Sequence, residues 1–144
     1  MSGQVAAKID EISAEFADLE PRERLELLLE YAAKLPPLPA HLQAERDAGM
    51  NRVHECQTPV FLWVRVVEGG VHIDADVAPE APTVKGFVSL LAEIYAGAAP
   101  VEVLAVETNL VQRFGLVEAL GMVRMRGLQA IAGYIRRQVA QAAV

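Results

Sequence analysis

The sequence predicts an α+β fold, in which a helical hairpin, a small antiparallel β-sheet and further helices follow one another. Apolar residues recur at helical spacing over residues 5–35, take the two-residue period of strands over residues 58–77, and return to helical spacing over residues 84–139. This segregated order is typical of an α+β domain with helices packed on one face of the sheet. The 144 residues show no linker or repeat, so we expect one domain over residues 1–144.

Two amphipathic helices are expected to form the hairpin. The apolar stripe of the first consists of Val5, Ile9, Ile12, Phe16 and Leu19. The stripe of the second consists of Leu25, Leu28, Leu29, Ala32 and Leu35. Pro21 suits the first turn of the second helix, because the N–H group that proline lacks has no partner there. Prolines end this helix, and residues 36–55 are expected to be a loop with one short helical turn within residues 40–48.

The next segment predicts a β-hairpin. Residues 58–67 are rich in β-branched and aromatic side chains, and Glu68-Gly69-Gly70 follows them as a turn. Residues 71–77 alternate apolar residues with polar ones, which is typical of a strand with one buried and one solvated face.

Helices are expected again after the hairpin. Thr83 is predicted to cap a helix over residues 84–95 through its hydroxyl group, and Gly97 is predicted to follow the end of that helix. Residues 101–106 fit a third strand or a helix equally well, because short apolar runs are ambiguous.

The C-terminal part of the chain predicts one short and one long helix. The short helix is expected to begin after Thr108 or Asn109 and to end near Gly121. The apolar stripe of the long helix consists of Leu128, Ile131, Ile135 and Val139. Arg124 and Arg126 are expected to precede this long helix.

The composition of the chain limits the classes of partner. A net charge of −6 with scattered basic residues disfavours binding to a nucleic-acid backbone. No run approaches the roughly 18 apolar residues of a membrane span, and the first residues do not show the pattern of a signal peptide. We therefore expect a soluble, cytoplasmic protein without nucleic-acid or membrane partners, in a reducing environment that keeps a free thiol available.

Cys56 is the single cysteine of the chain and the strongest candidate for a reactive side chain. It cannot form an internal disulfide, so any chemistry it performs uses its thiolate. Its neighbours His54, Glu55, Gln57 and Thr58 are polar, whereas a core cysteine usually lies in an apolar run. Because free cysteines are also among the most buried residues, a functional role and a packing role stay equally open.

Two other functions are compatible with the sequence. A hydrolase or transferase would pair the Cys56 nucleophile with a histidine base. The candidate bases are His41, His54, which shares a side with Cys56 if the segment is extended, and His72, which lies beside Asp74. A non-catalytic interaction module would leave Cys56 inert. One cysteine and three scattered histidines do not have the spacing of a metal site, and there is no glycine-rich phosphate loop.

Four segments resemble the motifs of SufE-like sulfur acceptors, in the same order. Glu55-Cys56-Gln57-Thr58-Pro59-Val60 resembles the family's Gly-Cys-Gln-Ser-x-Val-Trp. Residues 81–86 resemble its Ala-Pro-Ile-Val-Lys-Gly, and residues 124–131 resemble its Ser-Arg-x-x-Gly-Leu-x-Ala-Met. Leu35-Pro36-Pro37-Leu38 is similar to its Leu-Pro-x-Leu. The resemblance spans about residues 10–140, which is nearly the whole chain.

The resemblance implies a SufE/NifU-like fold and a role in sulfur transfer. Members of this family accept the persulfide sulfur of a pyridoxal-phosphate cysteine desulfurase, stimulate that enzyme and pass the sulfur to an iron–sulfur cluster scaffold. Cys56 is therefore the expected persulfide acceptor. The expected partners are a SufS-like desulfurase and a SufBCD-like scaffold. The residues expected to contact the desulfurase are Arg124, Gln57, Glu55 and His54. No cofactor, metal or independent enzymatic activity is expected for the chain itself.

Some positions differ from the family motifs, and others match them but are not expected to take part in sulfur transfer. Glu55 replaces the family's glycine, which restricts the backbone of the Cys56 loop. Val123 replaces the serine before the arginine, and Lys85 and Gly86 are expected to have structural roles. The polar residues 40–57 are expected to move, so that they hide a persulfide and expose it on docking.

Overall fold

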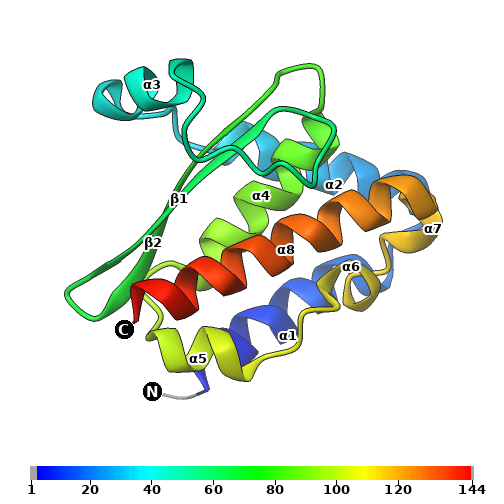
Figure 1. Cartoon of the computed structure of the whole chain (residues 1–144). Coiled ribbons are helices and arrows are strands. Elements are labelled where there is room, and N and C mark those ends of the chain that lie inside the picture. The colour runs from blue at the N-terminus through cyan, green and yellow to red at the C-terminus, as the bar shows by residue number, and fades with distance from the viewer. Residues whose placement is uncertain (1–2, 144) are drawn as a thin grey trace.

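The computed structural model describes residues 3–143 and confirms the α+β prediction (Figure 1). Its elements are α1 (Gln4–Ala17), α2 (Pro21–Lys34), α3 (Ala40–Asp47), β1 (Val60–Val67), β2 (Gly70–Val77), α4 (Pro82–Tyr95), α5 (Pro100–Ala105), α6 (Leu110–Arg113), α7 (Val117–Leu120) and α8 (Met122–Ala142). The two strands form one antiparallel sheet. Since a two-stranded sheet is at best marginally stable in water, the helices must supply most of the buried surface.

The predicted helical hairpin is formed by α1 and α2. Pro21 is the first residue of α2, as expected, and a capping box precedes it. In this box, the Glu20 backbone N–H group donates a hydrogen bond of 2.9 Å to the Glu23 carboxylate, and the Glu20 side chain accepts one in return. The box satisfies backbone groups that lack partners at a helix start.

The predicted β-hairpin is also confirmed. Val60 pairs with Val77 at one end of the sheet, and Val67 pairs with Gly70 at the other. Glu68 and Gly69 form the turn, with φ values of 52° and 80°. Two positive φ values produce the twist that suits a two-residue hairpin turn.

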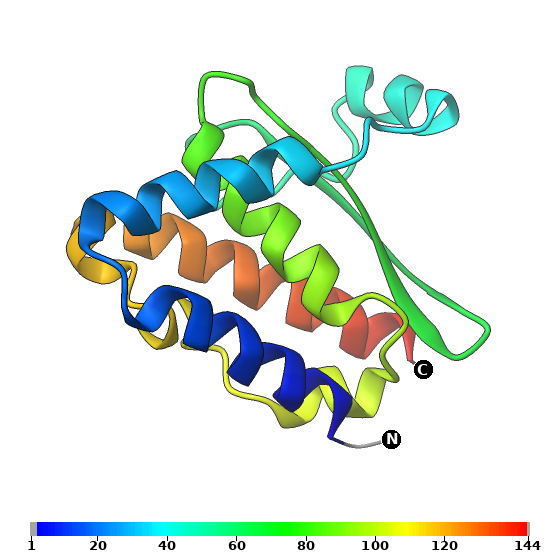
Figure 2. The same cartoon turned by 180° about the vertical axis from the view of Figure 1, so that it is seen from behind.

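The main core lies between the sheet and the helices on its inner face. α8 contacts β1, α4 contacts β2, and α2 packs against α4 on the far side (Figure 2). Fully buried residues fill these contacts: Leu28, Leu62, Leu90, Leu91 and Ile131. The inner strand residues and the helix stripes therefore meet as the periodicity predicted.

One helix packs on the opposite, outer face of the sheet. Leu38 and Leu42 cluster there with Trp63, a β1 residue, and α3 carries Leu42 (Figure 1). The Trp63 indole N–H group donates a hydrogen bond of 3.0 Å to the Glu45 carboxylate. The short helical turn expected within residues 40–48 is thus a helix, and it covers the part of the outer face that Phe61 and Trp63 form.

The start of α4 corrects one prediction. α4 begins at Pro82, after Ala81 in the N-cap position, and no side chain caps it. Thr83 lies inside the first turn, so its predicted capping role is wrong. The proline itself starts the helix, because its fixed φ suits the first helical position. Residues 101–106, left open between strand and helix, are mostly helical and belong to α5.

The segment before the last helix also differs from the prediction. The expected single short helix is divided into α6 and α7 around Gly115, whose φ is 66°. α8 begins at Met122, so Arg124 and Arg126 lie in its first two turns and not before it. The apolar stripe did not reveal this start, because Met122 and Val123 are exposed.

None of the helices within residues 3–143 combines the length and the apolar character that crossing a membrane requires.

Candidate functional site

Cys56 lies on a turn between α3 and β1. The Val53 N–H group donates to the Val60 carbonyl at 2.8 Å, and the Cys56 N–H group donates to the Val53 carbonyl at 3.2 Å. This turn exposes His54 and Glu55 and directs Cys56 inward, where its residue is 7% exposed. The expectation that His54 shares a side with Cys56 is wrong, because the segment is a turn and not an extended strand.

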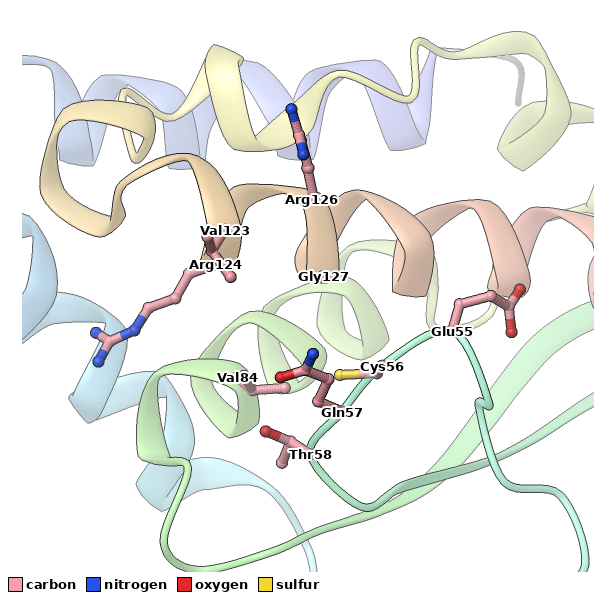
Figure 3. Close-up of a pocket in the computed structure, with 9 residues that line it drawn as sticks. All are labelled: Glu55, Cys56, Gln57, Thr58, Val84, Val123, Arg124, Arg126 and Gly127. Carbon is pink, nitrogen blue, oxygen red and sulfur yellow. The ribbon is translucent and has the colours of Figure 1, made fainter.

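The Cys56 side chain borders a cavity of about 330 Å³. Its lining residues are Glu55, Cys56, Gln57, Thr58, Val84, Val123, Arg124, Arg126 and Gly127. Figure 3 shows the Cys56 sulfur pointing toward the cavity, whereas the guanidinium groups of Arg124 and Arg126 point away from it. Cys56 is therefore packed in the main core and still has an open volume next to its sulfur atom.

Three segments far apart in the sequence build this cavity. The Cys56 turn supplies one wall, Val84 comes from the first turn of α4, and the first two turns of α8 supply the other wall. A Cβ atom placed on Gly127 would lie 4.0 Å from the Cys56 sulfur, so α8 passes directly beside the thiol.

Glu55 points away from the thiol and toward α8. Its carboxylate accepts a hydrogen bond of 2.6 Å from the Arg137 guanidinium, and the two side chains are 47% and 58% exposed. The Arg137 guanidinium also lies 6.0 Å from the centre of the Tyr134 ring. Burial, and secondarily the nearby Glu55 carboxylate, raise the pKa of Tyr134. Glu55 therefore fastens the Cys56 turn to α8, a role that its place beside the cysteine did not suggest.

The structure brings four of the five predicted site residues to one cavity. Cys56, Glu55, Gln57 and Arg124 all line it, whereas His54 does not. The sequence reasoning missed Gly127, Arg137 and Val123. Val123, which lines the cavity, is 78% exposed, and the preceding residue Met122 is 56% exposed, so exposed apolar area begins at the rim of the cavity. The sequence did contain one signal for Met122 and Val123: both are apolar, yet both lie outside the apolar stripe of α8.

The geometry does not supply the histidine base of a hydrolase. Of residues 3–143, no histidine lines the Cys56 cavity. His72 lies 3.4 Å from the Asp74 carboxylate, but it pairs with Arg65 toward the turn end of the sheet, whereas the Cys56 segment enters at the Val60 end. The same part of the chain has no group of three or more histidine, cysteine or acidic side chains that could hold a metal ion.

Comparison with known proteins identifies the family. The SufE model, described as an Fe–S metabolism associated domain, matches residues 10–139. The chain belongs to the SufE family. This membership confirms the resemblance of the four motifs and associates the chain with iron–sulfur metabolism.

Two relatives match nearly the whole length of this SufE-family chain, and a third matches a part of it. An uncharacterized SufE-like protein of Mycobacterium tuberculosis is 34% identical over 137 residues, which is 94% of each protein. A solution structure of a hypothetical protein from Thermus thermophilus is 39% identical and superposes with a TM-score of 0.78, covering 94% of this chain and 95% of that one. A chloroplastic quinolinate synthase of Nicotiana tabacum is 35% identical over 104 residues, which is 72% of this chain but 14% of that enzyme.

Proposed function

We propose that this SufE-family protein accepts sulfur on Cys56 from a cysteine desulfurase and delivers it to an iron–sulfur cluster scaffold. The observation that carries the proposal is the Cys56 sulfur beside a cavity of about 330 Å³, on the turn that matches the family's cysteine motif. The donor is a SufS-like enzyme whose own pyridoxal phosphate generates the persulfide. The recipient is a SufBCD-like scaffold.

The transfer step is a thiol–disulfide type exchange that needs no oxidant. The Cys56 thiolate attacks the outer sulfur of the desulfurase persulfide, so that a bond from Cys56 Sγ to this sulfur forms. The sulfur–sulfur bond of the desulfurase breaks, and its cysteine leaves as a thiolate. Removal of that persulfide frees the desulfurase for another turnover, which accounts for the stimulation expected of a sulfur acceptor.

The burial of Cys56 requires the turn to move during transfer. A residue that is 7% exposed cannot reach a sulfur atom on another protein while the turn packs against α8. A surface ion pair such as Glu55–Arg137 contributes only about 0–1 kcal/mol, so docking can release it at small cost. The closed turn then protects the loaded sulfur from reductants after the partner leaves.

We further propose that the rim of the Cys56 cavity binds the desulfurase. Met122 and Val123 supply exposed apolar area, and Arg124 supplies an exposed cation next to them. Methionine and arginine are both enriched in protein interfaces, and arginine is also enriched among the residues that contribute most of the binding energy. Gln57, Glu55 and His54 are exposed on the adjoining turn and complete this surface.

Arg124→Ala is expected to weaken docking. The desulfurase concentration that gives half-maximal sulfur loading should rise about five- to tenfold, because an interface arginine loses both charge and contact area. Arg65→Ala is the matched control, since Arg65 is 53% exposed on β1 and lies toward the other end of the sheet. Equal loading curves for Arg124→Ala and Arg65→Ala would contradict the assignment of this docking surface.

Sulfur loading is tested by intact mass. The protein is incubated with a SufS-like desulfurase and cysteine, without reductant, and we expect it to gain the mass of one sulfur atom that a reductant then removes. Because the chain has one cysteine, a gain that alkylation of the thiol prevents would assign the sulfur to Cys56. The absence of any gain while the desulfurase itself carries a persulfide would contradict the proposed function.

A further inference from the structure

Three glycines lie inside the long helices α4 and α8. Glycine within a helix costs roughly 0.5–1 kcal/mol relative to alanine, so each position calls for a physical reason. Packing explains Gly86, because a Cβ atom there would lie 2.1 Å from the Leu28 carbonyl oxygen of α2. A Cβ atom on Gly133 would meet the flexible end of Arg137 at 3.5 Å.

The packing of the free protein does not explain Gly127. Apart from its two chain neighbours and the local helix backbone, Cys56 Sγ is the one described atom within 4 Å of a Cβ placed there, at a distance of 4.0 Å. That distance is an ordinary van der Waals contact, so alanine would fit beside the thiol without displacing a neighbour. Alanine would also favour the helix. Gly127 thus shares with Gly133 the lack of a packing reason in the free protein, but of the two only Gly127 borders the Cys56 cavity.

A persulfide on Cys56 would need space in this cavity. Its outer sulfur lies about 2.05 Å beyond Sγ, at the length of a sulfur–sulfur bond. Sγ faces the cavity that Gly127 helps to line, so an outer sulfur directed toward α8 would enter the volume that a methyl group on Gly127 would fill. The free thiol tolerates that methyl group at 4.0 Å, but a second sulfur atom between the two does not fit.

We propose that Gly127 is a positioning residue that keeps open the space for the outer sulfur of a Cys56 persulfide. This inference rests on the proposed function, because it requires Cys56 to carry sulfur. On this proposal, α8 contacts the outer sulfur of the persulfide at Gly127 but leaves the free thiol without such a contact. The outer sulfur lies against the helix backbone at Gly127, away from solvent, whereas the free thiol leaves this space empty.

The inference predicts a selective effect of Gly127→Ala. The rate at which iodoacetamide alkylates the free Cys56 thiol should stay within about twofold of wild type, because the methyl group leaves the thiol undisturbed. The persulfide should lose its outer sulfur to a reductant about five- to tenfold faster, because overpacking drives that sulfur out of the space beside the helix. A general effect on the thiol would change both rates by the same factor.

The persulfide is best made chemically, so that no desulfurase is needed. The Cys56 thiolate attacks the terminal sulfur of inorganic polysulfide; a sulfur–sulfur bond of the polysulfide breaks, and the shortened polysulfide leaves as an anion. Excess reagent is removed, and intact mass follows the loss of the outer sulfur after dithiothreitol is added. Gly133→Ala is the matched control, since it makes the same change in the same helix next to a flexible side chain.

The outcomes separate this inference from the proposed function. A shorter persulfide lifetime in Gly127→Ala, with Gly133→Ala and the alkylation rates near wild type, would support the role of Gly127. Equal lifetimes in all three proteins, or equal changes in lifetime and alkylation rate, would overturn it. If the wild type takes no sulfur from a desulfurase while the chemically made persulfides still differ, the proposed function fails and the role of Gly127 stands.

Discussion

Cys56→Ser is expected to lose all sulfur loading while the protein keeps its fold. A serine hydroxyl is not ionised near neutral pH and cannot form the sulfur–sulfur bond that holds the cargo, whereas a thiolate can. The cavity, Arg124 and the exposed pair Met122 and Val123 stay in place, so the variant should still bind the desulfurase. Intact mass after incubation with desulfurase and cysteine measures the loss, and a binding assay measures the retained docking.

The control for this experiment addresses packing. Cys56 is 7% exposed, so the serine hydroxyl enters a buried position and can destabilise the fold by about 1–3 kcal/mol if it finds no hydrogen-bond partner. Cys56→Ala removes the sulfur without adding a polar group and should show the same loss of loading. A gain of sulfur mass on either variant would show that another group accepts the sulfur and would remove Cys56 from the mechanism.

Gly86→Ala is expected to cause the largest loss of stability. Gly86 is buried in α4, and a Cβ atom there would lie 2.1 Å from the Leu28 carbonyl oxygen and 2.9 Å from its carbonyl carbon. Because the obstacle is backbone of α2, the two helices must separate. We expect a loss of about 3 kcal/mol or more in the free energy of unfolding, and a Tm lower by about 10 °C, against a total stability of roughly 5–15 kcal/mol.

The measurement is thermal and denaturant unfolding followed by circular dichroism, with the fluorescence of Trp63 as a second signal. Gly133→Ala serves again as the control, because its new methyl group meets only the end of the Arg137 side chain. That variant should match wild type or gain up to about 1 kcal/mol from helix propensity. If the two alanine variants unfolded at the same temperature, the close approach of α2 and α4 would not be what requires glycine. A lower unfolding temperature for Gly86→Ala alone would support the structural role expected for Gly86, which is to let α2 and α4 approach closely.

Membership of the SufE family, together with the geometry around Cys56, disfavours the two competing functions, a hydrolase and an inert interaction module. A hydrolase would need a base next to the Cys56 sulfur, and no described histidine lines the cavity that this sulfur faces. An inert interaction module would require no open volume beside the thiol, yet the Cys56 sulfur faces a cavity of about 330 Å³. The cavity and the family motif around Cys56 together favour a sulfur carrier over both alternatives.

The sequence alone determined the class of the fold and indicated the candidate reactive residue. Helical and strand periods depend on which residues share a face, a local property, so they placed α1, α2, β1, β2 and most of α4 and α8 correctly. The prediction was weakest at helix ends, because exposed residues such as Met122 and Val123 carry no periodic signal. The family motif around Cys56 is also local, so it singled out this cysteine without a structure.

Only the tertiary structure decided how Cys56 is held. The hydrogen bond of Arg137 to Glu55 and the position of Gly127 beside the Cys56 cavity bring together residues that lie far apart in the sequence, and no local pattern encodes such pairs. The turn that buries Cys56 among exposed neighbours depends on the Val53–Val60 hydrogen bond, which forms when the chain folds back beside β1. The local motif indicated which atom is the candidate acceptor, and packing against α8 determined its burial, its cavity and the space left beside its sulfur.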